Sequence, residues 1–170
     1  MVFDESGYRF DFTNCATAQK ADTITYHDLS SVDFIMETND NIVLIEVKNP
    51  DHPSATTQSR KSFLDDLRSD VYPYLISDKF KNVLLCTWAR GEKFEKPIWC
   101  VLLLEFGMMT KTDIAKLREK VFNRLPFSLN KPEFGSKQHF EKRFDLLSVS
   151  EFCSMFPMVI IDEVNECESF

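Results

Sequence analysis

The chain has 170 residues, which suits one domain with a substantial core, and its hydrophobic content of 44% excludes a disordered chain. Its net charge of −7 argues against a protein that binds nucleic acid through a basic surface alone. Part of this charge lies in a C-terminal acidic tail formed by Asp162, Glu163, Glu166 and Glu168. Because a site that captures divalent cations needs local acid, the charge lowers the expectation of a nuclease without excluding one.

Two further features concern location and cysteine chemistry. The chain has no apolar run long enough for a membrane helix, and its N-terminus lacks the basic and then apolar pattern of a signal peptide. We therefore expect a cytoplasmic protein without a membrane partner. The five cysteines form no CxxC pair and the histidines show no metal-ligand spacing, which argues against a disulfide framework or a zinc site.

The first half of the chain contains a predicted β-hairpin. Residues 8–13 alternate in polarity and predict a short leading strand, whereas 14–27 are weakly patterned and permit a helix. The segments 32–38 and 42–48 are rich in β-branched and aromatic residues, and between them lie the turn formers Asn39-Asp40-Asn41.

A helix and two strands are expected after a loop at 49–54. The helix begins near Thr56, and Pro73 ends or kinks its apolar stripe, which consists of Phe63, Leu67, Val71 and Leu75. The apolar segments 82–88 and 97–106 predict two strands joined by a hairpin loop, with the second strand in the centre of the sheet.

The last part of the chain alternates again between helix and strand. Thr110 begins a capping pattern, which is followed by a helical stripe of Ile114, Leu117, Val121 and Leu125. A loop at 127–139, a strand at about 143–149 and a short helix capped by Ser150 complete the prediction.

This element order predicts a single α/β (α+β) domain over residues 1–170, with a central mixed β-sheet flanked by helices. The core covers about residues 8–106, a helical and β extension covers 107–161, and the acidic tail covers 162–170.

Three charged residues interrupt the apolar hairpin. Glu46 and Lys48 share one face because side chains alternate along a strand, and Asp33 joins that face if the turn has an even number of residues. A turn at Asp40-Asn41 places Asp33 opposite Lys48, and a turn at Asn39-Asp40 places it opposite Glu46. A three-residue turn without a bulge places Asp33 on the other face.

Grouped in this way, the charges form a candidate metal site. The carboxylates of Asp33 and Glu46, with the backbone carbonyl of Val47, suit Mg²⁺ or Mn²⁺. Such a metal polarises a phosphoryl oxygen and activates water. Lys48 would orient that water, accept its proton or stabilise the developing charge, and a neighbouring cation would lower its pKa. The chemistry favoured is metal-assisted phosphodiester hydrolysis.

The pattern Asp33-(x)12-Glu46-Val47-Lys48 on a hairpin, followed by a helix and strands, resembles the PD-(D/E)XK nuclease superfamily. The resemblance covers about residues 8–106 and implies a restriction-endonuclease-like fold, with a helix, a three-stranded meander, a helix and a further strand. It implies that Asp33 and Glu46 bind metal and that Lys48 is catalytic. Val32 stands in place of the family proline, and residues 14–21 lack the acid that many members carry on their first helix.

We therefore expect a Mg²⁺-dependent or Mn²⁺-dependent nuclease or endonuclease, for which DNA ranks ahead of RNA as the substrate and the sequence does not decide between them. The alternative is a non-enzymatic module on the same scaffold that binds a protein or nucleic acid. The sequence leaves open whether the chain forms a homodimer or binds a protein partner.

Other candidate residues fit structural roles better. We expect Trp88 and Trp99 in the core, and Gln58 and His52 as polar loop or cap residues. The Phe-rich C-terminal part should pack internally. Basic residues after residue 110 are expected on a solvated helix face, because acidic residues are interspersed among them.

Overall fold

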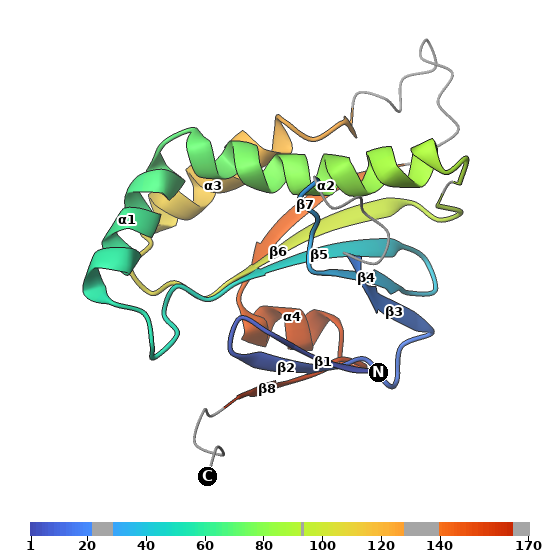
Figure 1. The fold of residues 1–170 in the computed structure, drawn as a ribbon, viewed down its shortest axis with the longest axis horizontal. Coiled ribbons are helices and arrows are strands. Elements are labelled where there is room, and N and C mark those ends of the chain that lie inside the picture. Colours follow the sequence, from blue (N-terminus) through green and yellow to red (C-terminus); the bar gives the residue numbers. More distant parts are fainter. Residues whose placement is uncertain (22–28, 93, 128–139, 165–170) are drawn as a thin grey trace.

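The computed structural model describes residues 1–21, 29–92, 94–127 and 140–164. It shows a single mixed α/β domain with two sheets (Figure 1). The described strands are β1 (Val2–Glu5), β2 (Tyr8–Asp11), β3 (Thr17–Lys20), β4 (Phe34–Glu37), β5 (Ile42–Lys48), β6 (Ile98–Leu104), β7 (Phe140–Leu147) and β8 (Ile160–Glu163). The described helices are α1 (Thr57–Arg68), α2 (Val71–Ala89), α3 (Lys111–Phe122) and α4 (Val149–Met155). None of these helices is long and apolar enough to cross a membrane.

The larger sheet is mixed and has the strand order β3-β4-β5-β6-β7. The strands β3, β4 and β5 form an antiparallel meander, whereas β6 runs parallel to both β5 and β7. All seven residues of β6 are buried, and so are the first six of β5. Near-continuous apolar strands of this kind need cover on both faces.

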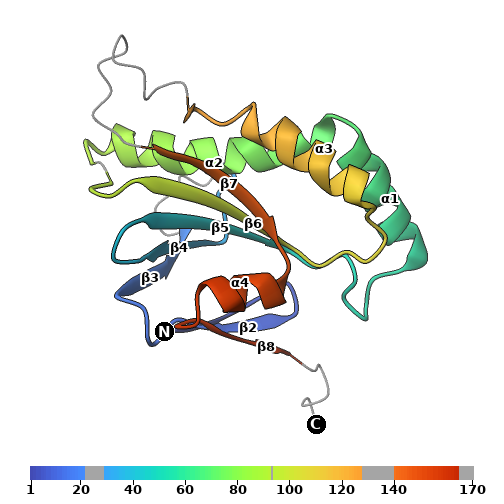
Figure 2. The same cartoon turned by 180° about the vertical axis from the view of Figure 1, so that it is seen from behind.

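That cover comes from two different layers (Figures 1 and 2). The helices α1, α2 and α3 lie on one face, where Phe80 and Ile76 of α2 pack in a cluster with Leu44 and Leu102 of the sheet. The small sheet β1-β2-β8 and the helix α4 lie on the other face. Their cluster is rich in aromatic side chains, including Phe10, Phe12, Phe34, Trp99, Phe152 and Phe156. The three Phe residues that are described near the C-terminus (144, 152 and 156) therefore pack internally, as expected.

The predicted strand at 82–88 is wrong, because these residues form the second half of α2. An apolar run of this length fits either a strand or a buried helix, and the buried positions Ile76, Phe80, Val83 and Thr87 have helical spacing. Trp88 is consequently 37% exposed at the end of a helix, whereas Trp99 is buried as expected. The segment 89–96 is also no hairpin loop, because it joins a helix to a strand that runs parallel to β5.

The boundary between α1 and α2 also differs from the prediction. The first helix ends at Arg68, and Pro73 lies in the first turn of a new helix that begins at Val71. Proline is tolerated there because the first turn has no intrahelical acceptors for its backbone N–H groups.

Several other elements follow the sequence patterns. The predicted strand at 97–106 appears as β6, and Thr110 caps α3 with a capping box completed by Asp113. The C-terminal strand and short helix are also present, although Ser148 rather than Ser150 caps α4. Asp162 and Glu163, expected in the tail, belong to β8.

The outcomes differ for two other predicted segments. Residues 17–20, where a helix was permitted, form the strand β3. The predicted loop at 127–139 lies outside the described residues apart from Phe127.

Candidate functional site

The β4–β5 hairpin adopts one of the two even registers. Phe34 pairs with Ile45 and Glu37 pairs with Ile42, and the N–H of Thr38 donates to the carbonyl of Asn41 at 2.8 Å. The tight turn is therefore Asn39-Asp40. Continuing this register by one residue sets Asp33 against Glu46, which is the arrangement expected for that turn.

Asp33 lies just before β4 and forms two hydrogen bonds with the end of β5. Its carboxylate Oδ2 accepts the backbone N–H of Val47 at 2.7 Å, and its own N–H donates to the carbonyl of Ile45 at 3.0 Å. The side chain thus supplies the acceptor that a regular strand would provide with its backbone.

The surroundings of Asp33 favour its neutral form. Burial and then repulsion from Glu46 raise its pKa from 3.8 to about 7, while Lys48 and the Val47 N–H act in the opposite direction. Glu5, from the N-terminal hairpin, adds to the increase. A carboxyl with this pKa can gain or lose a proton near neutral pH.

Glu46 is fully buried, and within the described part of the chain only one of its two carboxylate oxygens has partners. Its Oε1 accepts hydrogen bonds from Lys48 Nζ at 2.8 Å and from Lys79 Nζ at 2.7 Å. Its Oε2 is buried and has no hydrogen-bond partner among the described residues. An ionised carboxylate in the interior needs partners for both oxygens, so this oxygen is a point where a further group could bind.

The carboxylates around Lys48 determine the direction in which the pKa of its ammonium is shifted. Burial lowers its pKa, but the charges of Glu46 and Asp33 and the hydrogen bond to Glu46 outweigh burial, and the net direction is upward. We expected a neighbouring cation to lower this pKa, and the protein groups by themselves act in the opposite sense. In this arrangement Lys48 is suited to binding negative charge rather than to accepting a proton.

The helix α2 contributes two residues that sequence reasoning missed. Lys79 reaches Glu46, and the hydroxyl of Tyr72 is buried without a hydrogen-bond partner among the described residues. Burial, followed by the charges of Glu46 and Asp33, raises the pKa of Tyr72 well above its usual value. The spacing Tyr72, Ile76, Lys79, Val83 would have indicated these residues, but only after the second half of α2 had been recognised as helix.

The carbonyl of Val47, predicted as a metal ligand, faces the N-terminal hairpin. The hydroxyl of Ser6 lies 3.4 Å from this carbonyl and 3.3 Å from Glu5 Oε1. Glu5 in turn lies 3.6 Å from Lys20 at the end of β3. The β1–β2 turn therefore brings another acidic residue toward the end of β5, which no sequence pattern had indicated.

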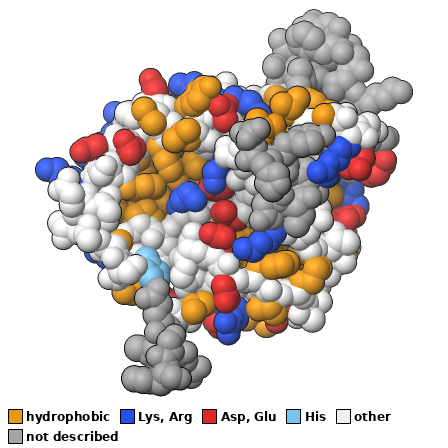
Figure 3. All heavy atoms as spheres, in the orientation of Figure 1, with side chains coloured by type: hydrophobic (Ala, Val, Ile, Leu, Met, Phe, Trp, Pro, Cys, Tyr) orange, Lys and Arg blue, Asp and Glu red, His pale blue; other side chains and the backbone are white. Residues whose placement is uncertain are grey.

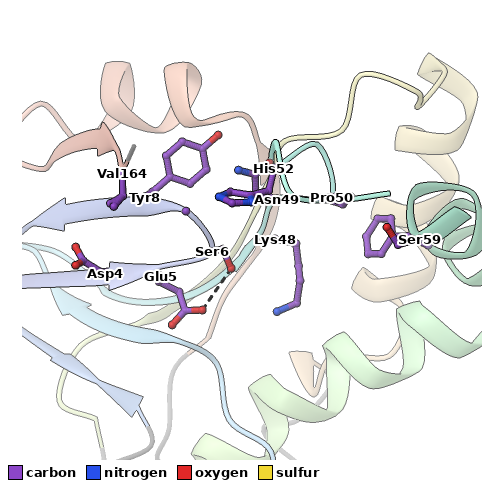
Figure 4. A pocket seen from close by; sticks show the side chains of 13 residues that line it. Asp4, Glu5, Ser6, Tyr8, Lys48, Asn49, Pro50, His52, Ser59 and Val164 are labelled. Atoms are coloured by element: carbon purple, nitrogen blue, oxygen red, sulfur yellow. Dashed lines mark hydrogen bonds between the residues drawn. The ribbon is translucent and has the colours of Figure 1, made fainter. Parts of the chain in front are cut away.

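A cleft of about 690 Å³ opens beside Lys48, between the β1–β2 turn, the loop after β5 and α1. Glu5 and Lys48 extend from opposite walls toward the same space (Figure 4). The face of the molecule seen in Figure 3 has acidic and basic side chains next to one another near its centre, beside a hydrophobic area. The site is thus reachable from solvent on the Lys48 side, where that side chain is 32% exposed.

The β1–β2 turn, which forms one wall of the cleft, has an unusual backbone conformation. Ser6 and Gly7 both have positive φ angles of 53° and 83°. A Cβ added to Gly7 would overlap the imidazole ring of His52, which is hydrogen-bonded through Nδ1 to Ser54. His52 was expected as a polar loop residue, and it lies in that loop with its ring against the turn.

Several described basic residues on and after α3 are engaged within the fold. Lys120 pairs with Asp70 at 3.2 Å, and Arg118 donates to the carbonyl of Leu146 at 3.3 Å. These contacts agree with a structural role for that helix face.

Among the described residues, no group of three or more His, Cys, Asp or Glu side chains is arranged to hold a metal ion. Asp33 and Glu46 are the two carboxylates that the predicted motif brings together. Comparisons with protein-family models, curated proteins and solved structures found no match to this chain.

Proposed function

We propose that the chain hydrolyses phosphodiester bonds of nucleic acid with the aid of a divalent cation, using a site of the PD-(D/E)XK type. The observation that carries this proposal is the buried carboxylate of Glu46. One of its oxygens is neutralised by two lysines and the other has no partner among the described residues, next to a second carboxylate at Asp33.

The protein groups fit Mg²⁺ or Mn²⁺. Glu46 Oε2 and the Asp33 carboxylate would hold the ion, and the carbonyl of Val47 is the third candidate ligand. Hard oxygen donors in small number are typical of Mg²⁺ sites, because this ion retains several waters. The bound ion would supply Lewis-acid activation of the phosphate and of water.

The lysines take different roles in this proposal. Lys48 lies at the cleft, where its ammonium can contact a phosphate oxygen and stabilise charge that develops during hydrolysis. Lys79 donates to Glu46 from the helix side and keeps that carboxylate in place. Lys48 is therefore the proposed catalytic residue and Lys79 a positioning residue.

The arrangement of elements supports a restriction-endonuclease-like fold. The meander β3-β4-β5 is followed by helices and by the parallel strand β6, with Asp33 just before the second strand and Lys48 at the end of the third. The preceding segment differs, because a β-hairpin rather than a helix occupies residues 2–11. We infer nucleic acid, and DNA before RNA, as the substrate.

Calorimetric titration with Mn²⁺ tests the metal site. Wild type should bind Mn²⁺ and Asp33→Asn should lose that binding, whereas Asp40→Asn in the exposed turn of the same hairpin should retain it. Equal binding by wild type and Asp33→Asn, or no binding by either, would overturn the proposal.

Cleavage assays test the chemistry at the same site. Single-stranded and plasmid DNA should be cut in Mg²⁺ or Mn²⁺, and Lys48→Met should abolish cutting while Mn²⁺ binding persists. Cutting at the wild-type rate by Lys48→Met would remove this residue from the mechanism.

The second candidate function is a non-enzymatic binding module on the same scaffold. It is favoured by the ion pairs of Lys48 and Lys79 with Glu46, which balance the buried charge with protein groups. Binding of DNA without metal or cleavage, unaffected by Asp33→Asn, would support this alternative.

A further inference from the structure

The cleft beside Lys48 is lined by both polar and apolar residues. The polar lining includes Glu5, Ser6 and Lys48, together with Asn49. The apolar lining includes Pro50, Ala55 and Phe63, and the volume of about 690 Å³ is within the range typical of small-molecule sites. A group attached to a phosphate at Lys48 would have to occupy this space.

The aromatic side chain of Phe63 in this lining is held in place by neighbouring rings. The ring of Phe63 makes edge-to-face contacts with Tyr72, at a centroid distance of 4.8 Å, and with Phe106, at 5.2 Å. Its side chain is half-buried and lines the cleft. A fixed aromatic ring at the wall of a cleft is a stacking surface for a planar ligand.

The charges of the lining argue against a bound duplex. Lys48 is the only Lys or Arg in the described lining of the cleft, whereas Asp4 and Glu5 are acidic. A duplex is bound mainly through contacts to many phosphates, which require a track of cations. One ammonium beside an aromatic wall instead suits one phosphate and one ring.

We propose that this cleft binds a single unpaired nucleotide, with its base against Phe63 and its phosphate at Lys48. The inference rests on the proposed function and specifies its substrate as single-stranded nucleic acid or an extruded nucleotide. In a duplex both faces of each base are covered by stacked neighbours, so the base has to leave the stack before it can enter a cleft of this kind.

Fluorescence anisotropy in EDTA measures this binding without hydrolysis. The probes are a fluorescein-labelled single-stranded 12-mer DNA and the same sequence as a blunt duplex. The single strand should bind more tightly than the duplex, and Phe63→Leu should weaken single-strand binding roughly 5- to 150-fold. Phe122→Leu, at an exposed phenylalanine on α3, is the matched control and should bind as wild type does.

A series of abasic probes distinguishes the loss of base stacking in Phe63→Leu from a disturbance of the fold by this substitution. Single-stranded probes with one abasic position each should be cut more slowly in Mn²⁺ when that position lies next to the cut, and Phe63→Leu should abolish the difference. Ala55→Leu provides a second variant, which adds bulk to the apolar lining of the cleft and should weaken single-strand binding with unchanged thermal unfolding.

The outcomes distinguish this inference from the proposed function. Equal binding or cutting of single strand and duplex, no effect of any abasic position, or wild-type binding by both Phe63→Leu and Ala55→Leu would each overturn the inference. In those cases Mn²⁺ binding that depends on Asp33 would still support the proposed function. A different result would be no Mn²⁺ binding by wild type together with single-strand binding that still depends on Phe63. That result would overturn the hydrolysis proposal and the placement of the nucleotide at a catalytic site. The cleft would then bind a base without cutting the strand.

Discussion

Lys79 of α2 and Glu46 of β5 form a hydrogen-bonded ion pair of 2.7 Å at a carboxylate that is completely buried. Lys48 approaches the same oxygen, Oε1, at 2.8 Å. Two ammonium groups therefore share one carboxylate oxygen, and the second oxygen, Oε2, has no hydrogen-bond partner among the described residues. Under the proposed function, Lys79 should therefore stabilise this region and oppose the binding of a cation at Glu46.

Replacement of Lys79 by Met should reduce stability but increase affinity for metal. Loss of a hydrogen bond to a buried charged group should lower the free energy of unfolding by about 1–3 kcal/mol. Removal of a positive charge next to Glu46 should strengthen Mn²⁺ binding, because like charges repel across a short distance in the interior. Urea unfolding in EDTA and calorimetry with Mn²⁺ measure the two effects.

Lys81→Met is the matched control on the same helix. Lys81 pairs with Asp78 at the surface, so its loss should change stability by less than about 1 kcal/mol and leave Mn²⁺ binding unchanged. Weaker Mn²⁺ binding by Lys79→Met would contradict the prediction and would show that Lys79 is needed to orient Glu46.

The raised pKa of Asp33 predicts a specific dependence of stability on pH. Because this pKa is about 7 in the folded protein and about 3.9 in the unfolded chain, the folded state holds the proton more tightly. The stabilisation is complete below about pH 4 and is lost as the pH rises to about 7, at no more than about 1.4 kcal/mol per pH unit. Asp33→Asn should remove this contribution.

The measurement is the difference in free energy of unfolding between wild type and Asp33→Asn in EDTA from pH 4.5 to pH 8. This difference should change most between pH 5 and 7 and become constant above it, while Asp40→Asn should show no such trend. A difference that is independent of pH would mean that Asp33 is ionised throughout and that its environment is more polar than its burial suggests.

The hairpin and its possible registers could be predicted because they depend on neighbouring residues. Asn39-Asp40 is a favourable two-residue turn between β-branched segments, and the turn determines which residues face one another. The sequence could not choose between the two even turns, since Asn41 is also a good turn residue. Local chemistry therefore left two even registers and one odd register for the site, and the structure adopts the even register with the turn at Asn39-Asp40.

The partners of Glu46 and Asp33 could not be predicted, because they come from distant segments. Lys79 lies on a helix whose second half resembles a buried strand in sequence, and Glu5 lies on a strand with no clear alternation. The position of Glu5 also depends on the pairing of β2 with β8 near the C-terminus. Contacts over such sequence distances are determined by packing between layers, and a local sequence pattern does not predict them.

Gly7 should be intolerant of a side chain for two separable reasons. Its φ of 83° is unfavourable for other residues, by about 1–2 kcal/mol, and an added Cβ would overlap the ring of His52. Gly7→Ala should therefore destabilise the protein by more than the backbone term alone. The double variant Gly7→Ala/His52→Ala should recover the steric part, relative to His52→Ala, as measured by thermal unfolding.

The control for Gly7 is Gly91, which also has a positive φ, of 73°, but has open space where a Cβ would be placed. Gly91→Ala should show only the backbone cost. Equal losses for Gly7→Ala and Gly91→Ala would mean that the β1–β2 turn moves away from His52 easily and that this wall of the cleft is not fixed.

Tyr72 provides a test of whether the buried site is completed by a further group. Its hydroxyl is buried with no partner among the described residues, and Glu46 Oε2 is in the same condition. If nothing else binds there in EDTA, Tyr72→Phe should raise the free energy of unfolding by about 1 kcal/mol, because it removes a desolvated polar group. Tyr74→Phe, at a residue that is 51% exposed, should stay within about 0.5 kcal/mol of wild type. Urea unfolding of both variants gives the answer, and a loss of stability in Tyr72→Phe would instead show that an ordered water joins this hydroxyl to the protein.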